Sequence, residues 1–336
     1  MSIALVITVR DERDMLRSNL LYHHYLGVEK CFVYDDGSTD GTQETLADLD
    51  FVVLRPSVGL TELDSSSERW AGQYDTHVGA RQRVNIEHAV ETASGQGFAW
   101  LLAFDADEFI VVDRSTPVAG ALSTTLNALP ADIEGAVFKP LEVLQRRVEY
   151  GDVLVEETLF KRTDAKESRK TYDPFAGKEV AVPIAYGHQA GKMGVRLGVN
   201  PKPKSTHRFV HADGSPLRTR TVGDLLHFYS HDSRAFIEKF RLIKDHPDRH
   251  VQGTEVALQK RLWRDVVNRA GLDAAQLRDY FAKWVMFSDG EVDRLSRRRG
   301  LPFLPSQPVL VEVTSVREAL RELDRQRVVG QPLGSS

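Results

Sequence analysis

The chain has 336 residues, 41% of them hydrophobic, and a formal net charge of −4 at pH 7. It can bury a large core, and its mildly acidic balance excludes a general attraction to nucleic acid. The single cysteine, Cys31, excludes an intramolecular disulfide and suits a reducing compartment. No basic and apolar signal opens the sequence, and no apolar run reaches about 18 residues, so we expect a cytoplasmic protein and leave peripheral membrane contact open.

Short apolar runs alternate with amphipathic segments in the first third of the chain. The pattern predicts strands over residues 3–9, 30–34, 51–54 and 98–103, and helices over 14–26, 42–49 and 84–93. Such alternation is typical of a largely parallel sheet whose ligand crevice lies at the carboxyl ends of its strands. We therefore predict an α/β fold with a mixed, mainly parallel central sheet.

Acidic side chains follow two of these strands. Asp105, Asp107 and Glu108 come directly after residues 98–103, where uncompensated buried charge would be costly, so a cation is expected beside them. In an extended backbone Asp105 and Asp107 point to the same side and can converge on Mg²⁺ or Mn²⁺. The alternative is that the acidic string only caps the next turn or helix.

The second acidic turn, Asp35 and Asp36, strengthens the prediction of a site. Thr8 also falls at a predicted strand end, so the fold would gather these side chains with Asp105 into one crevice. The alternative for residues 35–39 is an ordinary Asp-Gly turn. No G-x-G-x-x-G follows the first strand and no P-loop motif occurs, so neither a dinucleotide site nor a P-loop is supported.

Three motifs carry a resemblance to a known family: Thr-Val-Arg-Asp-Glu at 8–12, Tyr-Asp-Asp-Gly-Ser-Thr-Asp-Gly-Thr at 34–42, and Asp-Ala-Asp-Glu-Phe at 105–109. They resemble GT-A glycosyltransferases of the family 2-like group, closest to the branch that includes the family 92 enzymes. Weaker matches at 20–28, 191–196, 207–209 and 226–230 extend the resemblance over roughly the first 240 residues. It implies a GT-A, Rossmann-like nucleotide-diphospho-sugar transferase fold with a C-terminal helical extension.

The resemblance implies a role for individual residues. Base and ribose would be bound by Thr8, Val9, Arg10, Glu12, Asp35, Asp36, Arg81 and Asp105. The diphosphate would be bound by Lys192, Arg196 and His207, with the glycine-rich segment 187–198 as a lid, and the metal by Asp105, Asp107 and His227. The alternatives are a surface loop for Arg10 and for 187–198, a solvated helix face for Arg81 and Arg83, and His231, His211 or His207 as weaker ligand candidates.

The catalytic base stays open. An inverting transferase needs a carboxylate or histidine within reach of the acceptor hydroxyl. Three candidates present themselves: Glu108 beside the metal pair, Glu142 after a predicted strand at 136–141, and Asp213 in a loop. Glu108 could instead serve helix capping or pair with a basic neighbour. Inversion is implied by the resemblance alone.

The domain prediction places the catalytic domain at residues 1–232, divided into a nucleotide-sugar half at 1–110 and an acceptor half at 111–232. A helical extension is expected over 233–329, with aromatic residues in its core and a charged, exposed helix at 316–327, and a disordered tail over 330–336.

The leading hypothesis is a Mn²⁺- or Mg²⁺-dependent hexosyltransferase that moves a sugar from a UDP-sugar to a saccharide or glycoconjugate acceptor. A sugar nucleotidyltransferase is the first alternative, although it would normally carry a glycine-rich basic loop directly after the first strand. A catalytically inactive carbohydrate- or nucleotide-binding protein is the second, and the intact acidic motifs argue against it.

Overall fold

The computed structural model describes residues 1–62, 72–187, 189–246, 248–249, 255–297 and 308–329. The chain forms two compact units: Met1–Lys139, Ala190–Leu225 and Ser315–Ser336 make the first, and Pro140–Gln189 and Leu226–Thr314 make the second. This division departs from the predicted boundary at 232, because strands β6 (Gly135–Val143) and β13 (Thr219–His227) each begin in the first unit and end in the second. The tail predicted over 330–336 lies outside the described residues.

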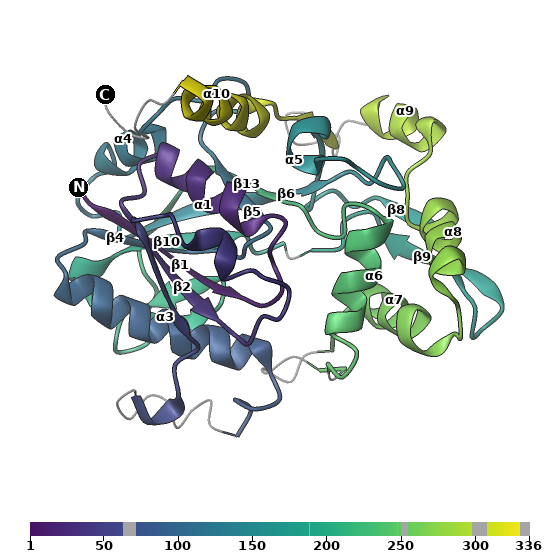
Figure 1. Cartoon of the computed structure of the whole chain (residues 1–336), viewed down its shortest axis with the longest axis horizontal. Coiled ribbons are helices and arrows are strands. Elements are labelled where there is room, and N and C mark those ends of the chain that lie inside the picture. The colour runs from purple at the N-terminus through teal and green to yellow at the C-terminus, as the bar shows by residue number, and fades with distance from the viewer. Residues whose placement is uncertain (63–71, 188, 247, 250–254, 298–307, 330–336) are drawn as a thin grey trace. The chain divides into compact units, whose positions relative to one another are not determined.

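The first unit is built on a mixed sheet (Figure 1) with the strand order β3-β2-β1-β4-β10-β6. Its other strands are β1 Ile3–Val9, β2 Lys30–Asp35, β3 Val52–Pro56, β4 Trp100–Ala103, β5 Glu108–Val111, β10 Lys192–Arg196, β11 Lys202–Ser205 and β12 Arg208–Val210. Its helices are α1 Leu16–Tyr25, α3 Val78–Gly95, α4 Ala121–Asn127 and α10 Ser315–Val329. Strands β3, β2, β1 and β4 pair in parallel, while β10 runs antiparallel to both β4 and β6. The predicted α/β class with a mixed sheet is confirmed.

The connections of this sheet define a crevice. The chain passes from β1 through α1 to β2 on one side, and from β3 through α3 to β4 on the other. Because such crossovers are right-handed, α1 and α3 cover opposite faces, and the strand order reverses between β1 and β4. Ligands of open α/β sheets bind at such a reversal, outside the carboxyl ends of the strands. These ends carry Thr8 and Asp105.

Three local predictions are wrong. Residues 42–49 form only a 3₁₀ turn, Glu44–Leu46, because Leu46 is the only buried residue of those three and one buried side chain does not sustain a helix. The segment 187–198 is no lid, because it contains β10, which is buried between β4 and β6. Helix α10 is not simply exposed: Val316, Ala319 and other apolar side chains are buried, and the helix packs against α1.

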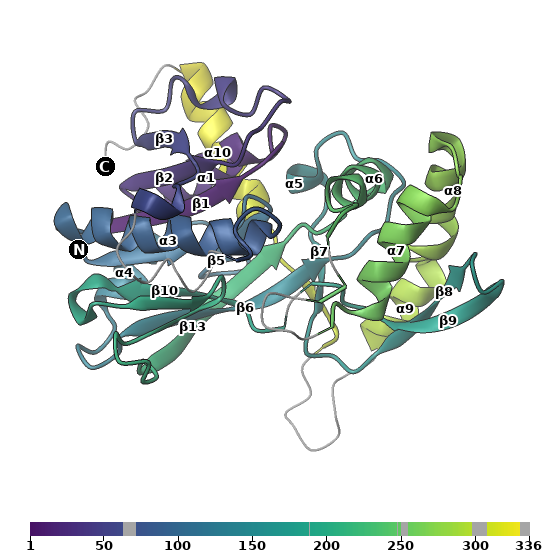
Figure 2. The same cartoon turned by 90° about the horizontal axis from the view of Figure 1, so that it is seen from below.

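The second unit combines a small antiparallel sheet, β14-β7-β6, with helices and a hairpin. Its elements are α5 Val153–Glu156, β7 Leu159–Arg162, β8 Ser168–Asp173, β9 Lys178–Pro183, α6 Ser233–Leu242, α7 Leu258–Arg269, α8 Ala274–Trp284, α9 Asp289–Arg297 and β14 Leu310–Glu312. Figure 2 shows α8 beside the β8–β9 hairpin, where Trp284 stacks on Tyr172. As predicted, aromatic residues such as Phe236 and Phe240 form the core.

No helix in the described part of the chain combines the length and the apolar character needed to cross a bilayer.

Candidate functional site

A narrow crevice lies at the reversal point between β1 and β4. Its polar lining comprises Thr8, Gln82, Asp105, Lys192 and Thr206. Its volume is about 10 Å³, the space of a single water molecule. The first unit thus brings together the β1 end, helix α3, the acidic turn after β4, and strand β10.

The cation beside the acidic turn is a lysine. The Lys192 ammonium lies 2.9 Å from Asp105 Oδ2 and 3.3 Å from Glu108 Oε2. Lys192 and Glu108 are buried, at 1% and 0% exposure. Burial alone would raise the pKa of Asp105, but the charge of Lys192 lowers that pKa below its usual value. Burial alone would lower the pKa of Lys192, but the carboxylates of Asp105 and Glu108 raise it above its usual value.

A side chain of helix α1 fixes the backbone of the acidic turn, residues 105–108. The Asn19 side-chain amide donates to the carbonyl oxygens of Ala106 (3.0 Å) and Glu108 (2.7 Å), which fixes the backbone on both sides of Asp107. His23 Nδ1 lies 2.9 Å from the Asn19 carbonyl oxygen, and its Nε2 accepts the Ile110 N–H at 3.2 Å, so the ring is neutral. The sequence offered no local signal for the Asn19 contacts, since they join residues that lie over 80 residues apart in the chain.

The neutral His23 makes stability depend on pH. Burial lowers the pKa of His23 to about 4, against an ordinary value of 6.5. The unfolded chain therefore binds the proton first, and the free energy of unfolding falls as pH drops from 6.5 to 4, by about 3 kcal/mol from this residue. Urea unfolding across that range should show a steeper loss for the natural protein than for His23→Gln. Parallel curves would contradict the assignment.

Several residues predicted to bind base and ribose share one hydrogen-bond network. The Asp36 carboxylate accepts from Arg81 Nε (2.7 Å) and Nη2 (2.8 Å), and also from Ser57 Oγ (3.1 Å). Asn85 on α3 donates to Ser57 Oγ and to Thr8 Oγ1 (2.9 Å). Asn85 and Ser57 were not predicted, although Asn85 lies one helical turn after Arg81.

The loops after β1 and β2 hold each other in place. Asp35 accepts from the Gly37 and Ser38 N–H groups and from Gln43, so it shapes the turn after β2. Asp11, in the left-handed region at φ 55°, accepts the Thr39 N–H at 2.7 Å.

The other predicted residues of this region are less directly placed. Glu12 N–H bonds Thr42 Oγ1, the Val9 carbonyl oxygen accepts the Asp36 N–H, and Arg10 is exposed. The ordinary-turn alternative thus describes Asp35, while Asp36 belongs to the network with Thr8.

The structure places Arg196 away from the crevice. Strand β10 is antiparallel to β4, so Met193 lies opposite Ala103 while Arg196 lies opposite Trp100, three residues or roughly 10 Å further back. The Arg196 guanidinium covers the Trp100 ring at 4.6 Å and donates to the Ile133 carbonyl oxygen at 2.7 Å. The phosphate-binding role expected of Arg196 is therefore wrong.

The predicted histidines divide between the two units. His207, after β11, acts electrostatically on Asp105 in the first unit, and its Nδ1 lies 3.2 Å from the Gly191 carbonyl oxygen. His227, at the end of β13, belongs to the second unit and stacks edge-on with Tyr229. A side chain at Gly187 would meet His227 Nδ1 at 2.7 Å, so a glycine is needed there.

The three candidates for the catalytic base all have structural contacts. Glu108 is buried with Lys192 and accepts the Asp105 N–H at 2.9 Å. Glu142, at 0% exposure in the second unit, accepts from the backbone of Tyr186 and pairs with Lys161 at 3.1 Å, where burial lowers the pKa of Lys161 to about 8. Exposed Asp213 accepts the Ser215 N–H at 2.8 Å in a turn. None of these contacts supports a base role.

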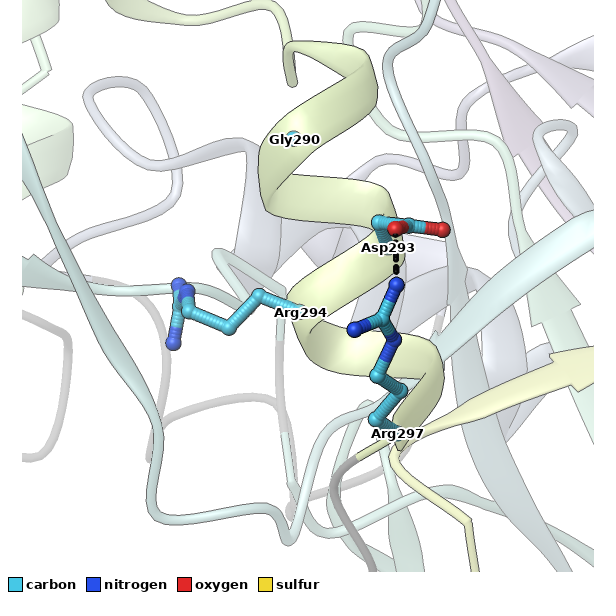
Figure 3. A pocket seen from close by; sticks show the side chains of 4 residues that line it. All are labelled: Gly290, Asp293, Arg294 and Arg297. Atoms are coloured by element: carbon cyan, nitrogen blue, oxygen red, sulfur yellow. Dashed lines mark hydrogen bonds and ion pairs between the residues drawn. The ribbon is translucent and has the colours of Figure 1, made fainter.

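A wider hollow, of about 390 Å³, lies on one face of α9 (Figure 3) and is lined by Gly290, Asp293, Arg294 and Arg297. Asp293 and Arg297 pair with each other at 2.5 Å, as neighbouring turns of an exposed helix commonly do. One solvated helix face offers no convergent groups for a nucleotide, so we place the candidate site at the β1–β4 crevice.

A sequence match links the chain to a described protein. No protein-family model matches. A glycosyltransferase-like protein of Arabidopsis thaliana is 22% identical over 208 residues, which cover 56% of this chain and 45% of that relative, so the chain spans less than half of its length.

Among solved structures, the chain is similar to mannosyl-3-phosphoglycerate synthase from Rubrobacter xylanophilus (17% identity, TM-score 0.28, 46% of this chain and 44% of that one). It is also similar to S. aureus TarS (13%, 0.35, 89% and 46%) and to glucosyl-3-phosphoglycerate synthase from Mycobacterium tuberculosis (13%, 0.27, 91% and 86%). At these scores the likeness is distant and assigns no substrate.

Proposed function

We propose that this protein is a metal-dependent glycosyltransferase of the family 2-like group, in the branch that includes family 92. It transfers a hexose from a UDP-sugar to a hydroxyl of a saccharide or glycoconjugate, with inversion. The carrying observation is the pair Asp105 and Asp107 at the carboxyl end of β4, beside the Thr8 network at the point of sheet reversal.

The net charge of the acidic turn and Lys192 favours a divalent ion. Asp105, Asp107 and Glu108 with Lys192 leave a formal charge of −2 on these four side chains. A diphosphate would be repelled by that charge unless a cation such as Mg²⁺ or Mn²⁺ lies between them.

The residues present fit such an ion. No trio of His, Cys, Asp or Glu side chains in the described ranges is arranged to hold a metal. However, Mg²⁺ is usually bound by one or two carboxylates and completed by substrate phosphates and water. Asp105 and Asp107 would supply the carboxylates, while His227 lies in the second unit. A bound ion would neutralise the diphosphate leaving group.

Asp36 and Asp105 would provide hydrogen-bond acceptors for the nucleotide. Asp36 keeps accepting capacity after its bonds to Arg81 and Ser57, since a carboxylate offers about four lone-pair sites. It would therefore accept the imide N–H of uracil. Gln82, which donates to Asp105 Oδ1 at 3.2 Å, would orient that carboxylate for the ribose.

A donor screen tests this function. Each nucleotide-sugar is incubated with the protein and Mn²⁺, and released nucleoside diphosphate is measured. We expect release from a UDP-sugar, and its loss when EDTA removes the metal. Pyrophosphate formed from a nucleoside triphosphate and a sugar phosphate would indicate a nucleotidyltransferase instead, and no turnover of any donor would favour a binding protein.

A further inference from the structure

Two of the three basic residues predicted to bind the donor diphosphate are engaged in other contacts. Of the three predicted binders, Lys192 is paired with Asp105 and Glu108, and Arg196 covers Trp100. His207 lies near the crevice, but a histidine is largely neutral at pH 7. If the proposed function holds, a further permanent cation is needed where negative charge develops on the leaving group.

The turn between β11 and β12 lies at the crevice. Thr206 lines it together with Asp105 and Lys192. His207 is close enough to Asp105 for its charge to act on that carboxylate. His207 Nδ1 also contacts the carbonyl oxygen of Gly191, the residue that precedes Lys192. The residue after His207 is Arg208, at the start of β12.

Among the described residues, the Arg208 guanidinium is held by backbone carbonyl oxygens. Its Nη1 donates to Gly191 (3.3 Å) and to His207 (2.8 Å), and its Nη2 donates to Ala190. Within the described ranges, no carboxylate forms an ion pair with it, unlike Arg81 with Asp36. Burial lowers the pKa of Arg208, which reflects a positive charge taken partly out of water without a compensating anion.

The carbonyl contacts leave this group prepared for an anion. They use three of the five guanidinium N–H groups, so two donors are left for a ligand. A planar guanidinium matches phosphate oxygens and can donate to two of them at once. Because the three carbonyls already orient the side chain, little further ordering is needed when the ligand binds.

We propose that Arg208 binds the diphosphate of the nucleotide-sugar donor, from the β11–β12 turn, as a cation that acts beside the metal. The residue was outside the predicted phosphate-binding set. Its position next to Thr206 and His207 makes this turn the phosphate-side wall of the crevice.

The test compares Arg208→Gln with Lys204→Gln, which removes the same charge from an exposed position on the same hairpin. Calorimetry with Mn²⁺ measures binding of pyrophosphate, UDP and uridine. Arg208→Gln should weaken pyrophosphate and UDP about tenfold or more, while uridine is unchanged. Lys204→Gln should stay within about threefold of the natural protein for all three.

The outcomes separate this inference from the proposed function. Pyrophosphate binding unaffected by Arg208→Gln, or an equal loss for uridine, overturns the role of Arg208 while UDP turnover can still stand. Pyrophosphate binding without any UDP binding sinks the proposed function but leaves Arg208 supported if its variant weakens pyrophosphate. If Arg208→Gln does not fold by circular dichroism, Arg208→Met replaces it, and unchanged pyrophosphate affinity in that variant likewise overturns the proposal.

Discussion

Lys192→Met is expected to lower the free energy of unfolding by about 3–5 kcal/mol, because it leaves a buried carboxylate without its cation. Glu108 is at 0% exposure and its Oε2 lies 3.3 Å from the Lys192 ammonium. Asp105, also paired with Lys192, keeps 35% of its side chain exposed and can be hydrated, so Glu108 accounts for most of the cost. Urea unfolding followed by circular dichroism measures the change.

Two matched variants check the cause. Adding Glu108→Gln to Lys192→Met removes the stranded charge and should restore at least half of the lost stability, since the amide can still accept the Asp105 N–H. Lys170→Met breaks an exposed pair with Glu179, at 3.0 Å, and should cost under about 1 kcal/mol. A Lys192→Met protein as stable as Lys170→Met would show that the buried pair does not stabilise the acidic turn.

The strands of the first unit could be predicted because their information is local. Residues 3–9 and 30–34 are apolar except for Thr8 and Lys30, as is typical of strands covered on both faces, and they form β1 and β2. The wrong predictions concern residues whose structural partners lie far away in the sequence. Around β10 the glycines suggest a loop, yet a side chain at Gly194 would lie 2.3 Å from Leu102 Cδ2, so glycine there permits close pairing with β4. No window of sequence contains both residues.

The same distinction applies to the candidate site. Asp36, Asp105 and Asp107 could be proposed as site residues because strand ends and acidic turns are visible in the sequence. Their partners could not be, since Arg81, Gln82 and Lys192 come from α3 and β10. A cation was expected beside the acidic turn, and the Lys192 ammonium lies there. The sequence did not show that this cation would be a lysine of the protein itself.

Asp107→Asn is expected to weaken Mn²⁺-dependent UDP binding about 100-fold or more and to reduce donor turnover correspondingly. Even the outer partners of metal ligands are worth about 10–100-fold in metal affinity, and a ligand's negative charge should matter at least as much. The substitution keeps the side-chain shape, and the backbone on both sides stays fixed by the Asn19 amide. Calorimetry with and without Mn²⁺ measures the effect, and Asp50→Asn, at an exposed position, is the control.

Uridine separates loss of the metal from loss of the whole crevice. The Thr8 and Asp36 network lies on β1, the turn after β2 and α3, whereas Asp107 lies in the turn after β4. Metal-independent uridine binding should therefore survive Asp107→Asn. If uridine and Mn²⁺-UDP weaken together, the substitution has disturbed the fold. If Mn²⁺-UDP binds unchanged, no metal is held at Asp107, and the cations of the diphosphate must come from the protein alone, with Arg208 foremost among them.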